Sequence, residues 1–209
     1  LPLEEIVPYI DWTPFFQTWE LYGRFPKILN DEIVGLEAQK LYDDAQKVLS
    51  KVIEENTIQV DVVYGFWQAF SDQNDDIHLI DEKGEAIAKS HTLRQQTSKS
   101  AKAKNMALSD FIRPKSDEAT DYLGAFVVSA GKNVADIAKQ YEEDLDDYSS
   151  IMIKAIADRI AEAATEYLHE KVRKEFWGYA SNESFNNEEL IREKYSGIRP
   201  APGLSLIHI

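Results

Sequence analysis

The sequence predicts an α+β fold, a single domain in which a mainly antiparallel, twisted sheet is flanked by long helices. Apolar residues recur at helical spacing in residues 31–55 and again in residues 147–174, which predicts two long helices with one apolar stripe each. Between them lie segments rich in β-branched and aromatic residues, which are typical of strands. Helix and strand signals do not alternate regularly, so α+β is favoured over a parallel α/β sheet.

The first thirty residues predict an irregular arm. They are rich in aromatic side chains, and Pro8, Pro14 and Pro26 interrupt any long helix. Such a segment is expected to pack by burying its rings. The helix over 31–55 should then begin at Asn30 as its N-cap.

Strands are expected next, over residues 59–70 and 76–89. The sequence Glu-Lys-Gly-Glu at 82–85 separates two alternating runs, which predicts a hairpin turn. The apolar run at 121–129 predicts a buried strand that ends at Gly131.

Helices are expected for most of the remaining chain. The periodicity indicates helices over 133–146 and 147–174. A short helix over 187–195 follows, with Asn186 or Asn187 as its cap.

Composition excludes several classes of function. The chain has 23 Lys and Arg against 37 Asp and Glu, a net charge of −14, so we expect no nucleic-acid binding and no binding to an anionic membrane. This charge favours cationic or zwitterionic ligands. Without cysteine the chain has no disulfide, Cys-ligated metal or thiol nucleophile. No run of about 18 apolar residues predicts a membrane span.

The histidines show no metal-ligand spacing, so no metal site is predicted. Each is expected to be a surface or capping residue. They are His78, His91, His169 and His208.

Two carboxylates on one helix stand out. Asp158 and Glu162 are four residues apart and share a face, and Glu166 continues the row. A solvated acidic face is the ordinary explanation. A site for a cation is the alternative, because like charges on adjacent turns cost stability unless something compensates them.

Residues 86–109 contain no Asp or Glu, in contrast to the acidic remainder of the chain. They form either a solvated loop or a dock for an acidic partner. Their cations are Lys89, Arg94, Lys99, Lys102 and Lys104.

The segment Arg199-Pro-Ala-Pro-Gly203 is the most informative local feature. Its prolines stiffen an extended backbone whose amides and carbonyls are free for a ligand. Arg199 can bind a carboxylate through two parallel hydrogen bonds. Gly203 permits a close approach of the backbone.

Segments along nearly the whole chain, in order, carry a resemblance to one family. They are Val7–Phe16, Ser90–Thr97, Asp110–Pro114, Asp121–Phe126, Ala157–Ala163, Glu166–Arg173, Trp177–Ala180, Asn187–Glu193 and Gly197–Gly203. Together they resemble the activation domain of cobalamin-dependent methionine synthase.

The resemblance implies a module of a large cytoplasmic methyltransferase, which moves a methyl group from methyltetrahydrofolate to homocysteine through cobalamin. Such a module binds S-adenosylmethionine and presents its methyl group to inactive cob(II)alamin for reductive methylation. Flavodoxin or a flavoprotein reductase supplies the electron. Cobalamin itself is held by another module of the same parent chain, so this chain has no catalytic residue and is not expected to turn over alone.

The resemblance also implies roles for particular residues. Arg199 would hold the carboxylate of S-adenosylmethionine, and the backbone of Ala201 would contact the ligand. Asp11 would lie at the ligand site, and Glu162 near the ligand's ammonium group. Asp158 would face the cobalamin module.

The family motif continues with tyrosine after Gly203, whereas Leu204 follows here. We therefore expect an activation domain over residues 1–203 that is incomplete at its C-terminus, and a non-native or truncated tail over 204–209. The chain starts without Met or a signal peptide, and we expect it to be cut from a longer protein.

Two other functions remain as alternatives. One is an acidic protein-interaction domain without a small-molecule ligand. The other is a hydrolase that uses Asp158 and Glu162 as a carboxylate pair, which would require pKa values pushed apart.

Overall fold

The computed structural model describes residues 1–99, 104–116 and 119–200. It contains helices and a four-stranded sheet, so the predicted α+β class is confirmed. The backbone forms two compact units. The helical unit comprises Leu1–Asp61 and the described residues from Val128 onward, and the sheet unit comprises Val62–Val127. No helix in the described part of the chain has the length and apolar character needed to cross a membrane.

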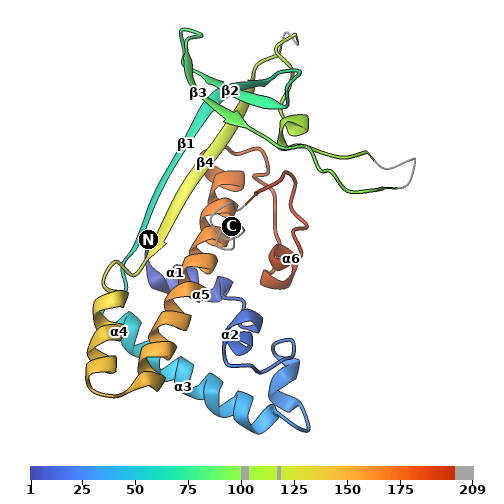
Figure 1. Ribbon diagram of the computed structural model, residues 1–209. Helices are drawn as coiled ribbons and strands as arrows, with labels where there is room; N and C mark the ends of the chain where they lie inside the picture. Colours follow the sequence, from blue (N-terminus) through green and yellow to red (C-terminus); the bar gives the residue numbers. More distant parts are fainter. Residues whose placement is uncertain (100–103, 117–118, 201–209) are drawn as a thin grey trace. The chain divides into compact units, whose positions relative to one another are not determined.

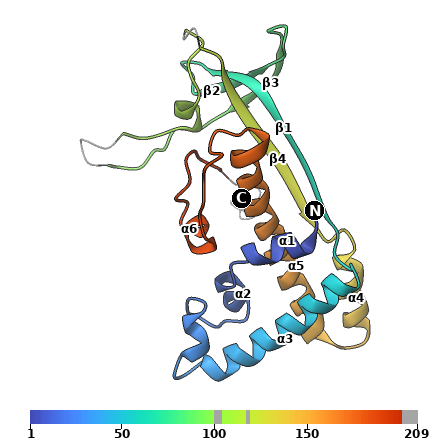
Figure 2. The ribbon, with the colours of Figure 1, turned by 180° about the vertical axis from the view of Figure 1, so that it is seen from behind.

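The helical unit is built around one long helix, α5 (Asp147–Lys171), against which α1, α2, α3 and α4 pack (Figure 1). Figure 2 shows the same packing from behind. The other elements are α1 (Leu3–Ile6), η1 (Val7–Tyr9), α2 (Thr13–Thr18), η2 (Lys27–Asn30), α3 (Gly35–Glu54), α4 (Val134–Glu143), the π-helix η4 (Val172–Phe176) and α6 (Asn187–Ile191).

Helix α5 is buried on most of its circumference because small and branched apolar residues recur along it. The apolar stripe predicted over residues 147–174 is confirmed, since its members are buried, the last of them on η4: Met152, Ile156, Ile160, Ala163, Tyr167 and Val172. The Asp146 side chain caps the helix by accepting a hydrogen bond of 3.0 Å from the Ser149 amide. An interior helix of this kind is stabilised by packing rather than by helix propensity.

The aromatic arm packs by ring burial, as predicted, but it forms short helices rather than an irregular chain. Phe15 and Phe16 are fully buried. The ring of Tyr42, on α3, lies 5.1 Å from that of Trp12 and 5.2 Å from that of Phe25. Aromatic contacts therefore join the arm to α3.

Two boundary predictions need correction or refinement. Helix α3 begins at Gly35 and not after Asn30, because the Asp31 carboxylate accepts hydrogen bonds from the Ile33 and Val34 amides and forms a turn first. The last helix ends at Ile191, and Asn186 is its cap, accepting 3.0 Å from the Glu189 amide.

The sheet unit holds the strands in the order β3-β2-β1-β4. Strand β2 pairs antiparallel with both β1 and β3, with Phe70 opposite His78 and His78 opposite Lys89. The bounds are β1 (Val60–Ser71), β2 (Asp76–Ile80), β3 (Ala86–His91), η3 (Leu108–Phe111) and β4 (Asp121–Ala130).

The predicted hairpin turn is confirmed. Asp81 accepts hydrogen bonds from the Lys83 and Glu85 amides, and Gly84 has a φ of +82°. The prediction that β4 is buried is wrong, because no residue of β4 is buried and Val127 is 70% exposed. A continuous apolar run is typical of a buried strand but does not require burial.

Gly131 is required at the end of β4, and substitution should test this. Its φ is +89°, and an added Cβ would come within 2.2 Å of Val134 Cγ2. Gly84 has a similar φ but nothing within 4 Å, so Gly84→Ala should cost about 1–2 kcal/mol of unfolding free energy. Gly131→Ala should cost clearly more, as measured by urea denaturation. Equal losses of unfolding free energy for the two variants would show that the contact with Val134 does not affect stability.

Candidate functional site

A buried arginine lies on the π-helix η4, just beyond the C-terminal end of α5. Arg173 is fully buried, and its Nε donates to Glu183 Oε2 at 2.8 Å. Its Nη1 lies 2.6 Å from His169 Nδ1, and its guanidinium carbon lies 4.2 Å from the centre of the Tyr195 ring. These contacts attach the chain that follows the helix, from Glu183 to Tyr195, to the end of the helix.

His169 is a neutral member of this cluster. Burial, together with the positive charges of Arg173 and Arg199, lowers its pKa from 6.5 to about 3. Since Arg173 donates to Nδ1, the proton of the neutral ring is on Nε2. The prediction of a surface or capping residue is therefore wrong for His169, which is buried because it lies on the packed face of α5.

The other described histidines pair with aspartates of the sheet unit. His78 lies 2.8 Å from Asp72, and the exposed His91 lies 2.7 Å from Asp76. His208 lies outside the described residues. Within the described ranges no group of three or more His, Asp or Glu side chains could hold a metal ion.

Arg199, the main residue of the predicted ligand site, pairs with Glu166 on α5. Its Nη2 donates to Glu166 Oε1 in an ion pair of which both side chains are largely buried. Burial raises the pKa of Glu166, while Arg199 and Arg173 oppose that rise. Two buried polar atoms of this pair, Glu166 Oε2 and Arg199 Nε, have no hydrogen-bond partner among the described residues.

Asp158 and Glu162 lie on the same helix and share one cation. Arg159 donates to Asp158 Oδ2 at 2.5 Å and also to Glu162 Oε2. Asp158 is 61% exposed and Glu162 36% exposed, whereas Arg159 is only 10% exposed. One arginine thus partly compensates the two like charges within the chain.

Asp11 lies between η1 and α2, two segments that pack on α5. Its carboxylate accepts a hydrogen bond of 2.9 Å from the Thr13 amide. The adjacent Ile10 carbonyl accepts from Asn187 on α6 at 3.4 Å, and the buried Asn187 Oδ1 has no hydrogen-bond partner among the described residues.

Three of the predicted site residues therefore lie on α5 or bind a residue of α5. Asp158 and Glu162 are on α5, and Arg199 binds α5 one turn beyond Glu162. Asp11 is on a segment that contacts α5, without a hydrogen bond or ion pair to the other three in the part of the chain described. Ala201 lies outside the described residues.

The Arg173 cluster was not predicted from the sequence. Its signal was a histidine and an arginine four residues apart, at positions that continue the buried face of α5. Charged residues on an apolar helix face are rarely buried unless paired, so such a position indicates a partner elsewhere in the chain.

The basic segment over 86–109 is partly neutralised. Lys89 pairs with Asp76 at 2.5 Å, and Arg94 pairs with both Asp75 and Asp110. Hydrogen bonds from Arg94 and from the Ala107 amide lower the pKa of Asp110 to about 2. Lys102 lies outside the described residues. The hypothesis that residues 86–109 dock an acidic partner stays a prediction.

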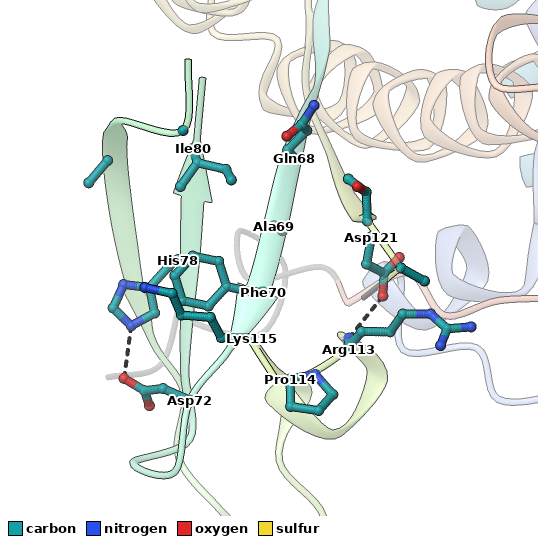
Figure 3. A pocket seen from close by; sticks show the side chains of 14 residues that line it. Gln68, Ala69, Phe70, Asp72, His78, Ile80, Arg113, Pro114, Lys115 and Asp121 are labelled. Atoms are coloured by element: carbon teal, nitrogen blue, oxygen red, sulfur yellow. Dashed lines mark hydrogen bonds and ion pairs between the residues drawn. The ribbon is translucent and has the colours of Figure 1, made fainter. Parts of the chain in front are cut away.

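A hollow of about 610 Å³ lies within the sheet unit (Figure 3). Phe70 and His78 stack with ring centres 4.8 Å apart, and the Lys115 ammonium lies 5.0 Å from the centre of the Phe70 ring. None of the predicted ligand-site residues lines it. We place the candidate site at Arg199 and Glu166 because two unpartnered buried polar atoms belong to this one ion pair.

Removing the buried charge of Arg173 should destabilise the helical unit. Arg173→Met leaves the Glu183 carboxylate buried without its partner, which typically costs about 3–5 kcal/mol. Urea denaturation measures the loss, and the double variant Arg173→Met with Glu183→Leu should recover part of it. A loss for the single variant below about 1 kcal/mol would contradict the assigned role.

Neutral His169 should make stability depend on pH. Its pKa is about 3 when folded against 6.5 when unfolded, so the unfolded chain binds more protons between these values and stability falls as pH drops below 6.5. One such group contributes a slope of up to about 1.4 kcal/mol per pH unit. His169→Asn should flatten the fall in unfolding free energy between pH 6.5 and 5. Equal slopes for both proteins would refute this.

The chain is similar to known proteins along nearly its whole length. Residues 2–207 match the family described as "Vitamin B12 dependent methionine synthase, activation domain". The chain is similar to a solved structure described as "Crystal Structure of the MetH Reactivation Domain bound to AdoHcy", with 51% identity and a TM-score of 0.92. The similarity covers 97% of this chain but only 62% of that one. The resemblance found in the sequence is confirmed, and the chain belongs to the family of vitamin B12-dependent methionine synthase activation domains.

Proposed function

We propose that this chain is the reactivation module of a cobalamin-dependent methionine synthase, which binds S-adenosylmethionine and presents its methyl group to cob(II)alamin for reductive methylation. The observation that carries the proposal is the relative with AdoHcy bound, at 51% identity over 97% of this chain. AdoHcy, S-adenosylhomocysteine, is S-adenosylmethionine without the transferred methyl group.

The side chains of the residues predicted to bind the ligand, Arg199, Asp11 and Glu162, suit such a ligand. Its carboxylate would bind Arg199, which can offer two parallel hydrogen bonds. Asp11 and Glu162 provide negative charge for its cationic groups, the ammonium and the sulfonium. The backbone of Ala201 would complete the contact. The net charge of −14 also favours a ligand with cationic groups.

The chain's part in the reaction would be to position the ligand. S-adenosylmethionine supplies the methyl group, so no side chain of this chain acts as a nucleophile. Fixing the donor in place turns an encounter of two molecules into a step within one assembly. Asp158, being 61% exposed, is available to contact the cobalamin-binding module.

The parent would be a cytoplasmic methyltransferase of methionine biosynthesis. Its cobalamin-binding module would be the first partner of this chain, and flavodoxin or a flavoprotein reductase would donate the electron. We also propose that residues 1–203 belong to the activation domain.

Calorimetric titration of S-adenosylmethionine into the chain tests the proposal. Wild type should bind saturably, and Arg199→Ala should weaken binding about 10- to 100-fold, as loss of a hydrogen bond to a charged group predicts. Arg192→Ala is the matched control, because Arg192 is an exposed arginine paired with Glu188 on α6.

Absence of binding to a folded wild-type chain would contradict the proposal. It would favour the alternative of an acidic protein-interaction domain without a small-molecule ligand. Binding that is indifferent to Arg199→Ala would leave a ligand site but remove Arg199 from it.

A further inference from the structure

The hollow of the sheet unit is lined by residues that the proposed function does not use (Figure 3). Its volume of about 610 Å³ lies within the range of small-molecule sites, about 300–1,000 Å³. It lies on one face of the sheet, because side chains two residues apart in a strand share a face. Its floor is formed by residues of three neighbouring strands: Gln68 and Phe70 of β1, His78 and Ile80 of β2, and Ala86 of β3.

Hydrogen bonds to the end of β1 hold one side wall of the hollow in place. The Ser71 amide donates to the Arg113 carbonyl at 2.8 Å, and the Lys115 amide donates to the Ser71 carbonyl at 3.2 Å. The Ser71 hydroxyl donates to the Ile112 carbonyl at 2.8 Å. Because these bonds involve the backbone of the wall, they fix its path along the end of β1. The Lys115 ammonium is thereby placed 5.0 Å from the centre of the Phe70 ring.

The carboxylates of Asp72 and Asp121, which line the hollow, are already bound within the sheet unit. Asp72 Oδ2 lies 2.8 Å from His78 Nε2, and this hydrogen bond is the largest of the causes that lower the pKa of Asp72 to about 2. Asp121 accepts hydrogen bonds from the amides of Arg113 and Tyr122, at 2.9 and 2.8 Å. Neither carboxylate therefore requires a cationic ligand.

The Lys115 ammonium, in contrast, is a charged group that a ligand can still satisfy. It has no carboxylate partner among the described residues, and it lies over the ring of Phe70. Lys89 and Arg94 of the same unit are both paired with aspartates. An aromatic face attracts a cation but does not accept its hydrogen bonds as an oxygen does, so the donors of the ammonium remain for water or for a ligand. An anionic ligand group can replace that water without removing the ring contact.

The remainder of the hollow favours an apolar body over further charge. Ile80, Ala86 and Pro114 supply apolar surface, and covering it is favourable because water is released. A second negative charge on the ligand would be repelled by the carboxylates of Asp72 and Asp121. The hollow therefore suits a ligand with one anionic group and an apolar body.

We propose that the hollow of the sheet unit binds a monocarboxylate with an apolar body, whose carboxylate contacts the Lys115 ammonium and whose body lies over Ile80 and Ala86. The apolar body supplies most of the affinity, because Lys115 is exposed and an exposed ion pair contributes little. The carboxylate sets the orientation of the ligand. The inference is independent of the proposed function, because it uses other residues.

The test is a titration of 2-naphthoate into the isotope-labelled 209-residue chain, followed by the amide NMR signals of β1, β2 and β3. Wild type should bind 2-naphthoate saturably and more tightly than the uncharged 2-naphthamide. Lys115→Gln should weaken binding of 2-naphthoate about three- to fivefold, as loss of an exposed ion pair predicts. It should leave the affinity for 2-naphthamide unchanged. Lys132→Gln is the matched control, because it removes an exposed lysine of the helical unit.

A second pair of variants tests where the ligand lies. Ala86→Glu places a longer, negatively charged side chain in the hollow and should weaken binding of 2-naphthoate more than tenfold. Ala88→Glu is its matched control, because Ala88 is on the same strand but opposite Leu79, on the other face of the sheet. It should leave the affinity unchanged. Both alanines are exposed, so both variants should fold, which the same NMR spectra check.

Each remaining outcome would overturn the inference. Absence of saturable binding to folded wild type would do so, as would shifts spread evenly over both units. Equal affinities for 2-naphthoate and 2-naphthamide would remove the role of Lys115, and equal effects of Ala86→Glu and Ala88→Glu would remove the hollow. Tighter binding of naphthalene-2,6-dicarboxylate would contradict the choice of a single charge. Binding of S-adenosylmethionine is measured separately, so the proposed function would stand in all these cases.

Discussion

The buried charge of Arg173 is the constraint on which the helical unit depends. A guanidinium that is fully removed from water is stable only when anions and acceptors satisfy it. Glu183 and His169 supply those contacts, and the face of Tyr195 covers the remaining surface. Because Glu183 and Tyr195 lie beyond the end of α5, satisfying Arg173 fixes the course of the following chain. That chain carries Arg199 to Glu166, so the geometry of the candidate site follows from the pairing of one buried residue.

The sequence predicted correctly those elements that are determined by residues close together in the chain. The hairpin between β2 and β3 was predictable because Asp81 and Gly84 form the turn by themselves. The buried stripe of α5 was predictable because its period is a property of the helix. The start of α3 was not, because Asp31 and Asn30 are both good capping residues and the hydrogen bonds of Asp31 place the turn before Gly35. The exposure of β4 depends on packing, which an apolar run does not specify.

The candidate site was predicted in part for the same reason. Arg199 stood out because of the stiff proline-rich sequence around it, and Asp158 and Glu162 because they are four residues apart. From the sequence, Glu166 is only a continuation of that row, and His169 is expected to be a surface or capping residue. Their roles depend on Arg199 and Arg173, whose approach is a tertiary contact with no local signature. A sequence can show which residues share a helix face, but the partner brought to each residue determines its chemistry.

The three acidic residues along α5 illustrate this point. Asp158, Glu162 and Glu166 occupy successive turns of one face, and their side chains are 61%, 36% and 11% exposed. The first two share Arg159, which balances them near water, where ion pairs contribute little. The third is desolvated, and its pKa is raised by that burial. Of the three, Glu166 alone combines burial with a buried carboxylate oxygen that has no hydrogen-bond partner among the described residues. The spacing of the three carboxylates does not reveal this difference, because it depends on Arg199, which reaches Glu166 from a distant part of the sequence.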